Sequence, residues 1–215
     1  MAGCSGEEAL IPDTGESFFP LEKGIYHIYT VHEVRYAASA GQEILNYEIR
    51  TEVVDSFPST GGGYTFVIHR SRRPSAPDPW EALDTWSVKK DERNVIVAEG
   101  NTSFLKLKFP VRAGTRWNGN TYNALGDDAY EFKDIGELME FNGMSFDKTM
   151  AVEQERNDDF IVFNDLRREI YARNVGLIYK EIVQLNYCTD DNCIGQQNIS
   201  QGVELRMVIK EYGKH

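Results

Sequence analysis

The sequence lacks any apolar run long enough to cross a bilayer as a helix, and its longest apolar stretches, at 94–98 and 176–179, have the length of strands. Long amphipathic helices that alternate with strands are also missing, which makes a doubly wound α/β fold improbable. Positive charge is in deficit, because 23 Lys and Arg residues face 34 Asp and Glu residues, for a formal charge of −11. Such a chain repels phosphate backbones, so nucleic acid is not expected as a partner.

Signals for catalysis or for a cofactor are equally scarce. No Gly-x-Ser-x-Gly motif is present, and the glycine-rich stretch at 61–63 lacks the Gly-Lys-Ser/Thr ending of a phosphate-binding loop. There are only four histidines, of which His27 and His32 lie five residues apart on one expected strand and therefore face opposite sides of it. We predict no catalytic residue, no metal site and no cofactor.

Acidic residues are abundant, with 34 in the chain, and they leave one enzymatic alternative open. The acid pairs at 127–128, 158–159 and 190–191 lack the spacing of a calcium loop and are interpreted as solvated turn residues. Glu137 with Glu140, or Glu153 with Glu155, could form the two-carboxylate site of a glycosidase. The alternative function is thus a carboxylate-dependent enzyme that acts on polysaccharide.

The N-terminus indicates a lipid anchor. Ala2 and Gly3 precede Cys4 in the manner of a bacterial lipobox, in which small residues stand before a cysteine that becomes lipidated. A polar stretch follows, so we interpret residues 1–17 as a flexible tether and expect Cys4 to carry the lipid once a signal segment has been removed. This interpretation places the protein in the bacterial cell envelope, anchored to the outer membrane on either side, with no membrane contact besides the anchor.

The other two cysteines, Cys188 and Cys193, bracket a short polar loop. Two thiols cannot complete a tetrahedral zinc site, and no histidine stands at ligand spacing from them. In an oxidising envelope compartment the pair is therefore predicted to form a disulfide.

Alternation of apolar and polar residues recurs along most of the chain and predicts half-buried strands. It is clearest around 45–53, where Leu45, Tyr47 and Ile49 share one face. The chain is expected to form one all-β, mainly antiparallel domain over 18–213, as a curved half-barrel or a sandwich of about nine to eleven strands. Helix is expected to be scarce, with 134–141 either a short helix or a strand edge. The expected strands are 25–36, 45–53, 63–70, 83–90, 93–98, 103–109, 150–156, 160–164, 176–187 and 203–212.

Three motifs carry a family resemblance that spans most of the chain from Phe18 onward. Phe-Pro-Leu at 19–21 and Phe-Pro-Val at 109–111 each precede a glycine and then an aromatic residue, and the third motif is Tyr-Ala-Arg-Asn-Val-Gly at 171–176. Together they resemble a group of uncharacterised Bacteroidetes-type envelope lipoproteins. The pattern is also similar to the open half-barrels of periplasmic lipoprotein carriers, a likeness of fold that implies binding rather than catalysis.

The expected function is therefore that of a non-catalytic envelope lipoprotein, which binds an apolar or glycan ligand or a partner envelope protein. A strongly curved sheet rich in aromatic residues should leave a cavity or groove on its concave side. Trp86 and Trp117 each follow a turn-rich segment, so we expect both near the mouth of that cavity, as candidate ligand-binding residues.

Overall fold

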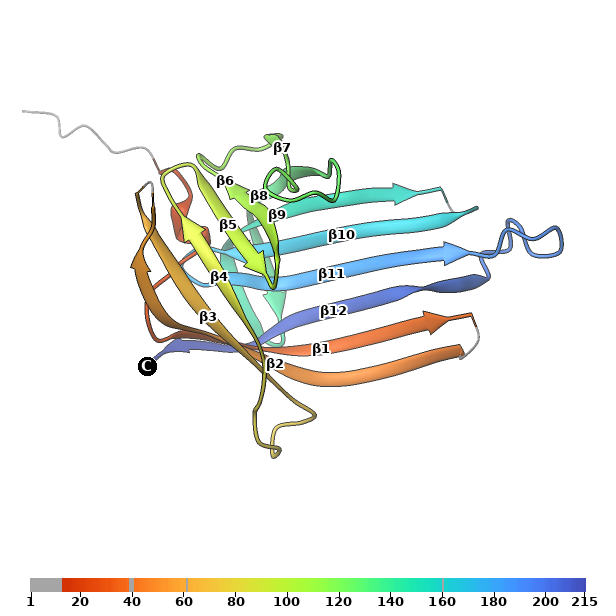
Figure 1. Cartoon of the computed structure of the whole chain (residues 1–215), viewed down its shortest axis with the longest axis horizontal. Coiled ribbons are helices and arrows are strands. Elements are labelled where there is room, and N and C mark those ends of the chain that lie inside the picture. The colour runs from red at the N-terminus through yellow and green to blue at the C-terminus, as the bar shows by residue number, and fades with distance from the viewer. Residues whose placement is uncertain (1–12, 39–40, 61, 160) are drawn as a thin grey trace, which may run out of the picture.

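The protein forms one twelve-stranded antiparallel sheet in a computed structural model that describes residues 13–38, 41–60, 62–159 and 161–215 (Figure 1). The expected all-β fold is confirmed. Within the described ranges the one helical element is η1 (Glu16–Phe18), and no helix there has the length and hydropathy of a membrane span. The strands are β1 (Ile25–Ala37), β2 (Gly41–Pro58), β3 (Tyr64–Arg73), β4 (Glu81–Lys90), β5 (Asn94–Glu99), β6 (Thr102–Lys108), β7 (Arg116–Asn118), β8 (Ala129–Phe141), β9 (Met144–Asp158), β10 (Phe163–Ala172), β11 (Gly176–Tyr187) and β12 (Ile199–Lys214).

The strand order is β6-β5-β4-β3-β2-β1-β12-β11-β10-β9-β8-β7, so the chain forms two meanders that meet where β1 pairs with β12. The expected strands at 25–36 and 176–187 match β1 and β11 closely. The short β7 and the first part of β8 were missed, whereas the segment 134–141, expected as a short helix or a strand edge, is strand within β8. The alternation in β8 is broken where Asp134 and Gly136 adopt positive φ angles of 48° and 87° and the pairing register shifts.

The expected strand at 160–164 was misplaced, because β10 begins only at Phe163. Ile161 and Val162 form a bend, in which Asp159 Oδ1 accepts hydrogen bonds from their backbone N–H groups at 2.8 and 2.7 Å. A side chain that holds the backbone in this way competes with strand pairing.

The sheet curls until its two edge strands meet, so that it is nearly closed into a barrel at one end (left in Figure 1). Leu105 on β6 donates its N–H to the carbonyl of Gly119, just after β7, at 2.8 Å. In return, the Trp117 indole Nε1 donates to the carbonyl of Leu105 at 2.8 Å. These two bonds satisfy backbone groups that an edge strand would otherwise expose.

The closed end is filled by the two Phe-Pro corners, which lie against each other. Val111 donates its N–H to the carbonyl of Thr14 at 2.9 Å, which joins the segment before the first corner to the second corner. Lys90 Nζ donates to the carbonyls of Glu16 and Phe19 at 2.8 and 2.9 Å, and it lies over the Phe109 ring. Phe18 and Phe109 are buried here in the main core.

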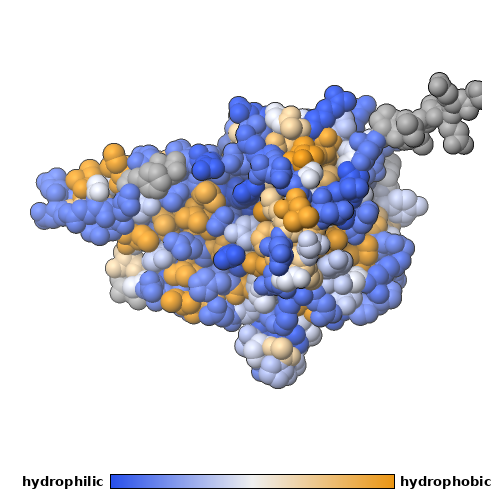
Figure 2. All heavy atoms as spheres, turned by 180° about the vertical axis from the view of Figure 1, so that it is seen from behind, coloured by the Kyte–Doolittle hydropathy of each residue, from blue (hydrophilic) through white to orange (hydrophobic). Residues whose placement is uncertain are grey.

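A second core lies where the β8–β9 hairpin, drawn behind the long strands in Figure 1, packs against β11 and β12. The Phe141 ring stacks on Tyr179 at 5.1 Å, and Asn142 Nδ2 donates to the carbonyl of Ile209 at 2.8 Å. Seen from behind, hydrophobic side chains still form separate patches among hydrophilic ones (Figure 2). On the opposite, concave side the strands of the two meanders enclose the space described below.

The closure predicts a strict requirement for glycine at position 119. A Cβ atom there would lie 2.3 Å from Cζ of the buried Tyr130 ring. Gly119→Ala should therefore overpack the seam, that is, the place where the edge strands β6 and β7 meet. We expect a loss of about 1–3 kcal/mol in the free energy of unfolding, measured by urea denaturation. In a Tyr130→Leu background Gly119→Ala should lower the free energy of unfolding by less, because the aromatic ring that the new Cβ atom would contact is absent. Equal costs in both backgrounds would show that the ring contact is not the cause.

Candidate ligand-binding cavity

A cavity of about 390 Å³ lies inside the curl of the sheet. Its volume falls in the range of about 300–1,000 Å³ that is typical of small-molecule sites. The lining is mainly apolar and comes from both meanders and from the first Phe-Pro corner. The apolar lining residues are Phe19, Pro20, Leu21, Ile25, Tyr29, Val31, Tyr47, Ile49, Val53, Ile68, Leu83, Trp86, Val88, Val97, Tyr171, Leu177, Ile182, Leu205 and Met207.

Strand register orders these residues from a closed inner end to an open mouth. The inner row contains Val53, Ile68 and Trp86, which are neighbours across β2, β3 and β4. β1 and β3 run in the same direction, so residues later in either strand lie nearer the mouth. The row through Val31 continues on one side to Tyr47 and on the other through Met207 and Lys180 to Glu169. The cavity wall therefore has an apolar inner end and contains charged side chains, such as Lys180 and Glu169, nearer the mouth.

A buried ionic network crosses the cavity wall from one meander to the other. Lys106 Nζ on β6 lies 3.0 Å from Glu169 Oε1 on β10 and 3.0 Å from Glu99 Oε1 on β5. Lys180 on β11 adds a second cation, 3.2 Å from the same Glu169 oxygen, and the Tyr171 hydroxyl donates to Glu169 Oε2 at 2.6 Å. The Glu169 side chain is only 2% exposed and that of Lys106 8%, so the network is shielded from bulk water.

The network keeps its members charged. Burial alone would raise the pKa of Glu169, but the nearby charges of Lys106 and Lys180 hold the pKa well below its ordinary value. Burial would likewise lower the pKa of Lys106, and the charges of Glu169 and Glu99 raise it instead. For Glu99, too, the charges of Lys106 and Lys180 outweigh burial and lower the pKa. Neither carboxylate is therefore poised to give up a proton near neutral pH.

Two arginines of β3 lie on the other wall, nearer the mouth. Arg70 stacks over the Trp86 ring at 3.8 Å and donates from Nη1 to both oxygens of Asp84 at 2.8 and 3.1 Å. Arg72 stacks over the Tyr47 ring, also at 3.8 Å. Burial, together with a hydrogen bond to a carboxylate, raises the pKa of Tyr47 to about 12. Each guanidinium group therefore lies over an aromatic ring beside the cavity.

The two tryptophans expected at the cavity have different places. Trp86 lines it, next to Ile68 across the β3–β4 pair. Trp117 does not line it, because its ring is 7% exposed and packs at the seam against Phe132 and Tyr130, with centroids 4.5 and 5.8 Å apart. The expected mouth position of Trp117 is therefore corrected to a position in the core, and ligand binding by Trp86 stays a prediction.

The acidic pairs considered for a glycosidase do not line the cavity. Glu137 and Glu140 are exposed on β8, and Glu153 and Glu155 lie on β9 away from it. The carboxylates that do line it are Glu52, Glu99 and Glu169, which the sequence analysis did not single out. Strand parity could have indicated Glu169, since it shares a face of β10 with the aromatic residue Tyr171.

The histidines expected on opposite faces do lie apart. His27 lines the cavity, where its Nε2 lies 2.6 Å from the carbonyl oxygen of Val175 and burial lowers its pKa. His32 lies in a separate groove on the other face, with its Nδ1 2.9 Å from Asn46 Oδ1. The two histidines are therefore not placed to bind one metal ion together.

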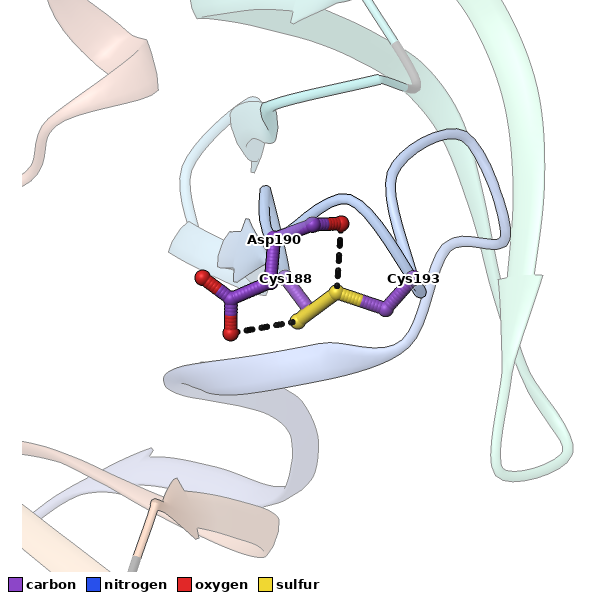
Figure 3. Close-up of side chains that lie close together, drawn as sticks. All are labelled: Cys188, Asp190 and Cys193. Atoms are coloured by element: carbon purple, nitrogen blue, oxygen red, sulfur yellow. Dashed lines mark hydrogen bonds between the residues drawn. A yellow bond between two sulfur atoms is a disulfide. The ribbon is translucent and has the colours of Figure 1, made fainter.

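Cys188 and Cys193 are joined in a disulfide at the far end of the molecule (Figure 3). Asp190 lies against it, with its carbonyl oxygen 3.3 Å from Cys193 Sγ and a carboxylate oxygen 3.9 Å from Cys188 Sγ. The three residues lie as close as metal ligands do, but sulfurs bonded to each other offer no thiolate. Cys4, the expected lipid attachment site, lies outside the described residues.

The ionic network predicts that Lys106→Met is strongly destabilising. Removal of the ammonium leaves Glu99 and part of the Glu169 charge buried without compensation, which should cost about 3–5 kcal/mol in the free energy of unfolding. Lys133→Met is the matched control, because Lys133 is 39% exposed in its pair with Glu131 and should cost less than about 1 kcal/mol. Urea denaturation at pH 7 measures both, and similar costs would contradict a buried network.

No protein-family model matches the chain, and no curated protein matches it. Two solved structures resemble it. A protein from Bacteroides fragilis, provisionally described as exported and with a YmcC-like fold, has 13% sequence identity and a TM-score of 0.49 over 92% of this chain and 99% of its own. A provisionally described lipoprotein from Parabacteroides distasonis has 12% identity and a TM-score of 0.36 over 91% of this chain and 98% of its own.

Proposed function

We propose that this protein is a non-catalytic binding protein of the cell envelope, which holds an apolar or amphipathic small molecule inside its curled sheet. The observation that carries the proposal is the cavity of about 390 Å³, with its apolar inner end. An apolar ligand that leaves water for such a site gains free energy in proportion to the apolar area that becomes buried.

The aromatic residues of the cavity favour an apolar ligand over a glycan. Sugars bind to open faces of aromatic rings. Trp86 and Tyr47 each have one face covered, by Arg70 and Arg72 respectively. The remaining surface of the inner end is provided by aliphatic side chains such as Val53 and Ile68, which match a hydrocarbon.

The ionisation of the cavity carboxylates favours binding over catalysis. A glycosidase needs one carboxyl group with a raised pKa as its general acid. Here the pKa values of Glu99 and Glu169 are both lowered, because each shares Lys106 as a partner. The two acids act as structural ions, and the polysaccharide-acting alternative is disfavoured.

The envelope location is supported by two cysteine features of the sequence. The lipobox-like residues before Cys4 would provide an anchor, and the disulfide between Cys188 and Cys193 is typical of an oxidising compartment. A tether of this kind would leave the cavity free to exchange a ligand with the membrane to which the protein is attached.

Filling the cavity should abolish binding. We expect the neutral hydrophobic fluorophore N-phenyl-1-naphthylamine to increase in fluorescence when it binds the wild-type protein. Ile68→Trp places a large ring in the inner row and should remove most of this increase. Val208→Trp is the matched control, because Val208 lies in the groove on the other face, and it should leave the titration unchanged. Equal binding by both variants, with melting curves that show both folded, would refute the cavity as the site.

A further inference from the structure

The charged residues of the cavity are mostly cations, in a chain whose formal charge is −11. Five cationic and three anionic side chains line it: Arg35, Arg70, Arg72, Lys106 and Lys180, and Glu52, Glu99 and Glu169. Glu52 is already paired, with Arg50 at 2.8 Å. The two other carboxylates belong to the network of Lys106 and Lys180. Arg35 and Arg70 pair with carboxylates outside the lining, Glu33 and Asp84 respectively, which leaves Arg72.

Arg72 is the cation of this set that forms no ion pair with any residue of the described ranges. One carboxylate that Arg72 influences is that of Glu33, which accepts from Arg35 Nε at 2.6 Å and from the Tyr47 hydroxyl at 2.7 Å. Arg72 contributes to the low pKa of Glu33 through its charge, but it lies beyond ion-pair distance. The Glu33 oxygens are thus already engaged, and Arg72, which lines the cavity, is left to pair with a ligand.

Arg70 adds a second guanidinium group beside Arg72 on the same face of β3. Its Nη1 is engaged with Asp84, whereas its Nε is buried and has no hydrogen-bond partner in the described structure. Because Arg70 lines the cavity, its positive charge would attract an anionic group that binds at Arg72. Contact with the Trp86 and Tyr47 rings restricts the two guanidinium groups, so less side-chain entropy is lost when an anion binds.

We propose that the ligand is a single-chain amphiphile with an anionic head group, carboxylate or phosphate, which binds Arg72 and Arg70 while its hydrocarbon chain fills the inner end. The order of residues along β3 supports this orientation, because Ile68 lies in the inner row and Arg70 and Arg72 follow it toward the mouth. This inference rests on the proposed function and adds the charge and the direction of the ligand.

The test compares amphiphiles of equal chain length that differ only in the head group. Dodecanoate, dodecyl phosphate, dodecanol and dodecylamine, each below its micellar concentration, are titrated against the protein loaded with N-phenyl-1-naphthylamine. We expect the two anions to displace the fluorophore at about tenfold or more lower concentration than the alcohol or the amine, the margin typical of a charge-assisted hydrogen bond. Acetate and inorganic phosphate, which lack the chain, should not displace it.

Arg72→Gln should reduce the affinity for dodecanoate about tenfold and leave that for dodecanol unchanged, because the variant removes a charge and keeps the cavity. Arg72→Lys keeps the charge and should retain part of the preference. The matched control is Arg206→Gln, since Arg206 also lies over a tyrosine ring, Tyr179 at 5.7 Å, but lines the groove on the other face. Thermal melting of each variant verifies that it is folded.

The outcomes separate this inference from the proposed function. Equal displacement by dodecanoate and dodecanol, or an acid preference that survives in Arg72→Gln, overturns the anionic head group and leaves the apolar site standing. Displacement by inorganic phosphate as effective as that by dodecyl phosphate also overturns it, because the ligand would then be a free anion. Failure of every chain to displace the bound fluorophore overturns the amphiphile inference, whereas failure of the fluorophore itself to bind the wild-type protein refutes the proposed function as well.

Discussion

The interaction on which the rest of this structure depends is the buried contact of Lys106 with Glu169. It joins β6, one edge strand of the sheet, to β10 in the opposite meander, and so it spans the interior that the curl encloses. An ion pair in such a place contributes little net stability by itself, but loss of one partner is expensive, so the two meanders are held in one arrangement. The cavity lies beside this contact because charged side chains cross there instead of close-packed apolar ones.

The motifs that carry the family resemblance all serve the closed end of the curl. The two Phe-Pro corners fill it, and Lys90 binds the backbone of the first of them. In the third motif Asn174 donates its N–H to the carbonyl of Ser17 at 2.7 Å. The mouth, with Arg70 and Arg72, lies outside these motifs. The three motifs therefore belong to the closed end of the cavity. The residues proposed to determine ligand specificity, Arg70 and Arg72, lie outside them.

Much of the fold could be predicted from the sequence, because alternation depends on local burial. β1 and β11 alternate regularly, and their expected bounds nearly match the observed ones. The full length of β8 could not be recognised, since its alternation breaks at Asp134 and Gly136. The buried position of Trp117 could not be predicted either, because it depends on the contact between β6 and β7. The Lys106 network joins residues 63 positions apart in sequence, so no local pattern could reveal it.

The account rests on one central claim, that the curled sheet holds a hydrocarbon chain. Native mass spectrometry of the full chain, isolated from bacterial membranes without detergent, tests it most directly, because a retained ligand adds its own mass and can be ejected and identified. We predict a one-to-one complex with a molecule that carries a hydrocarbon chain and an acidic head group, and loss of that complex in Ile68→Trp. A spectrum of the bare chain alone, both as isolated and after incubation with dodecanoate, would contradict the claim.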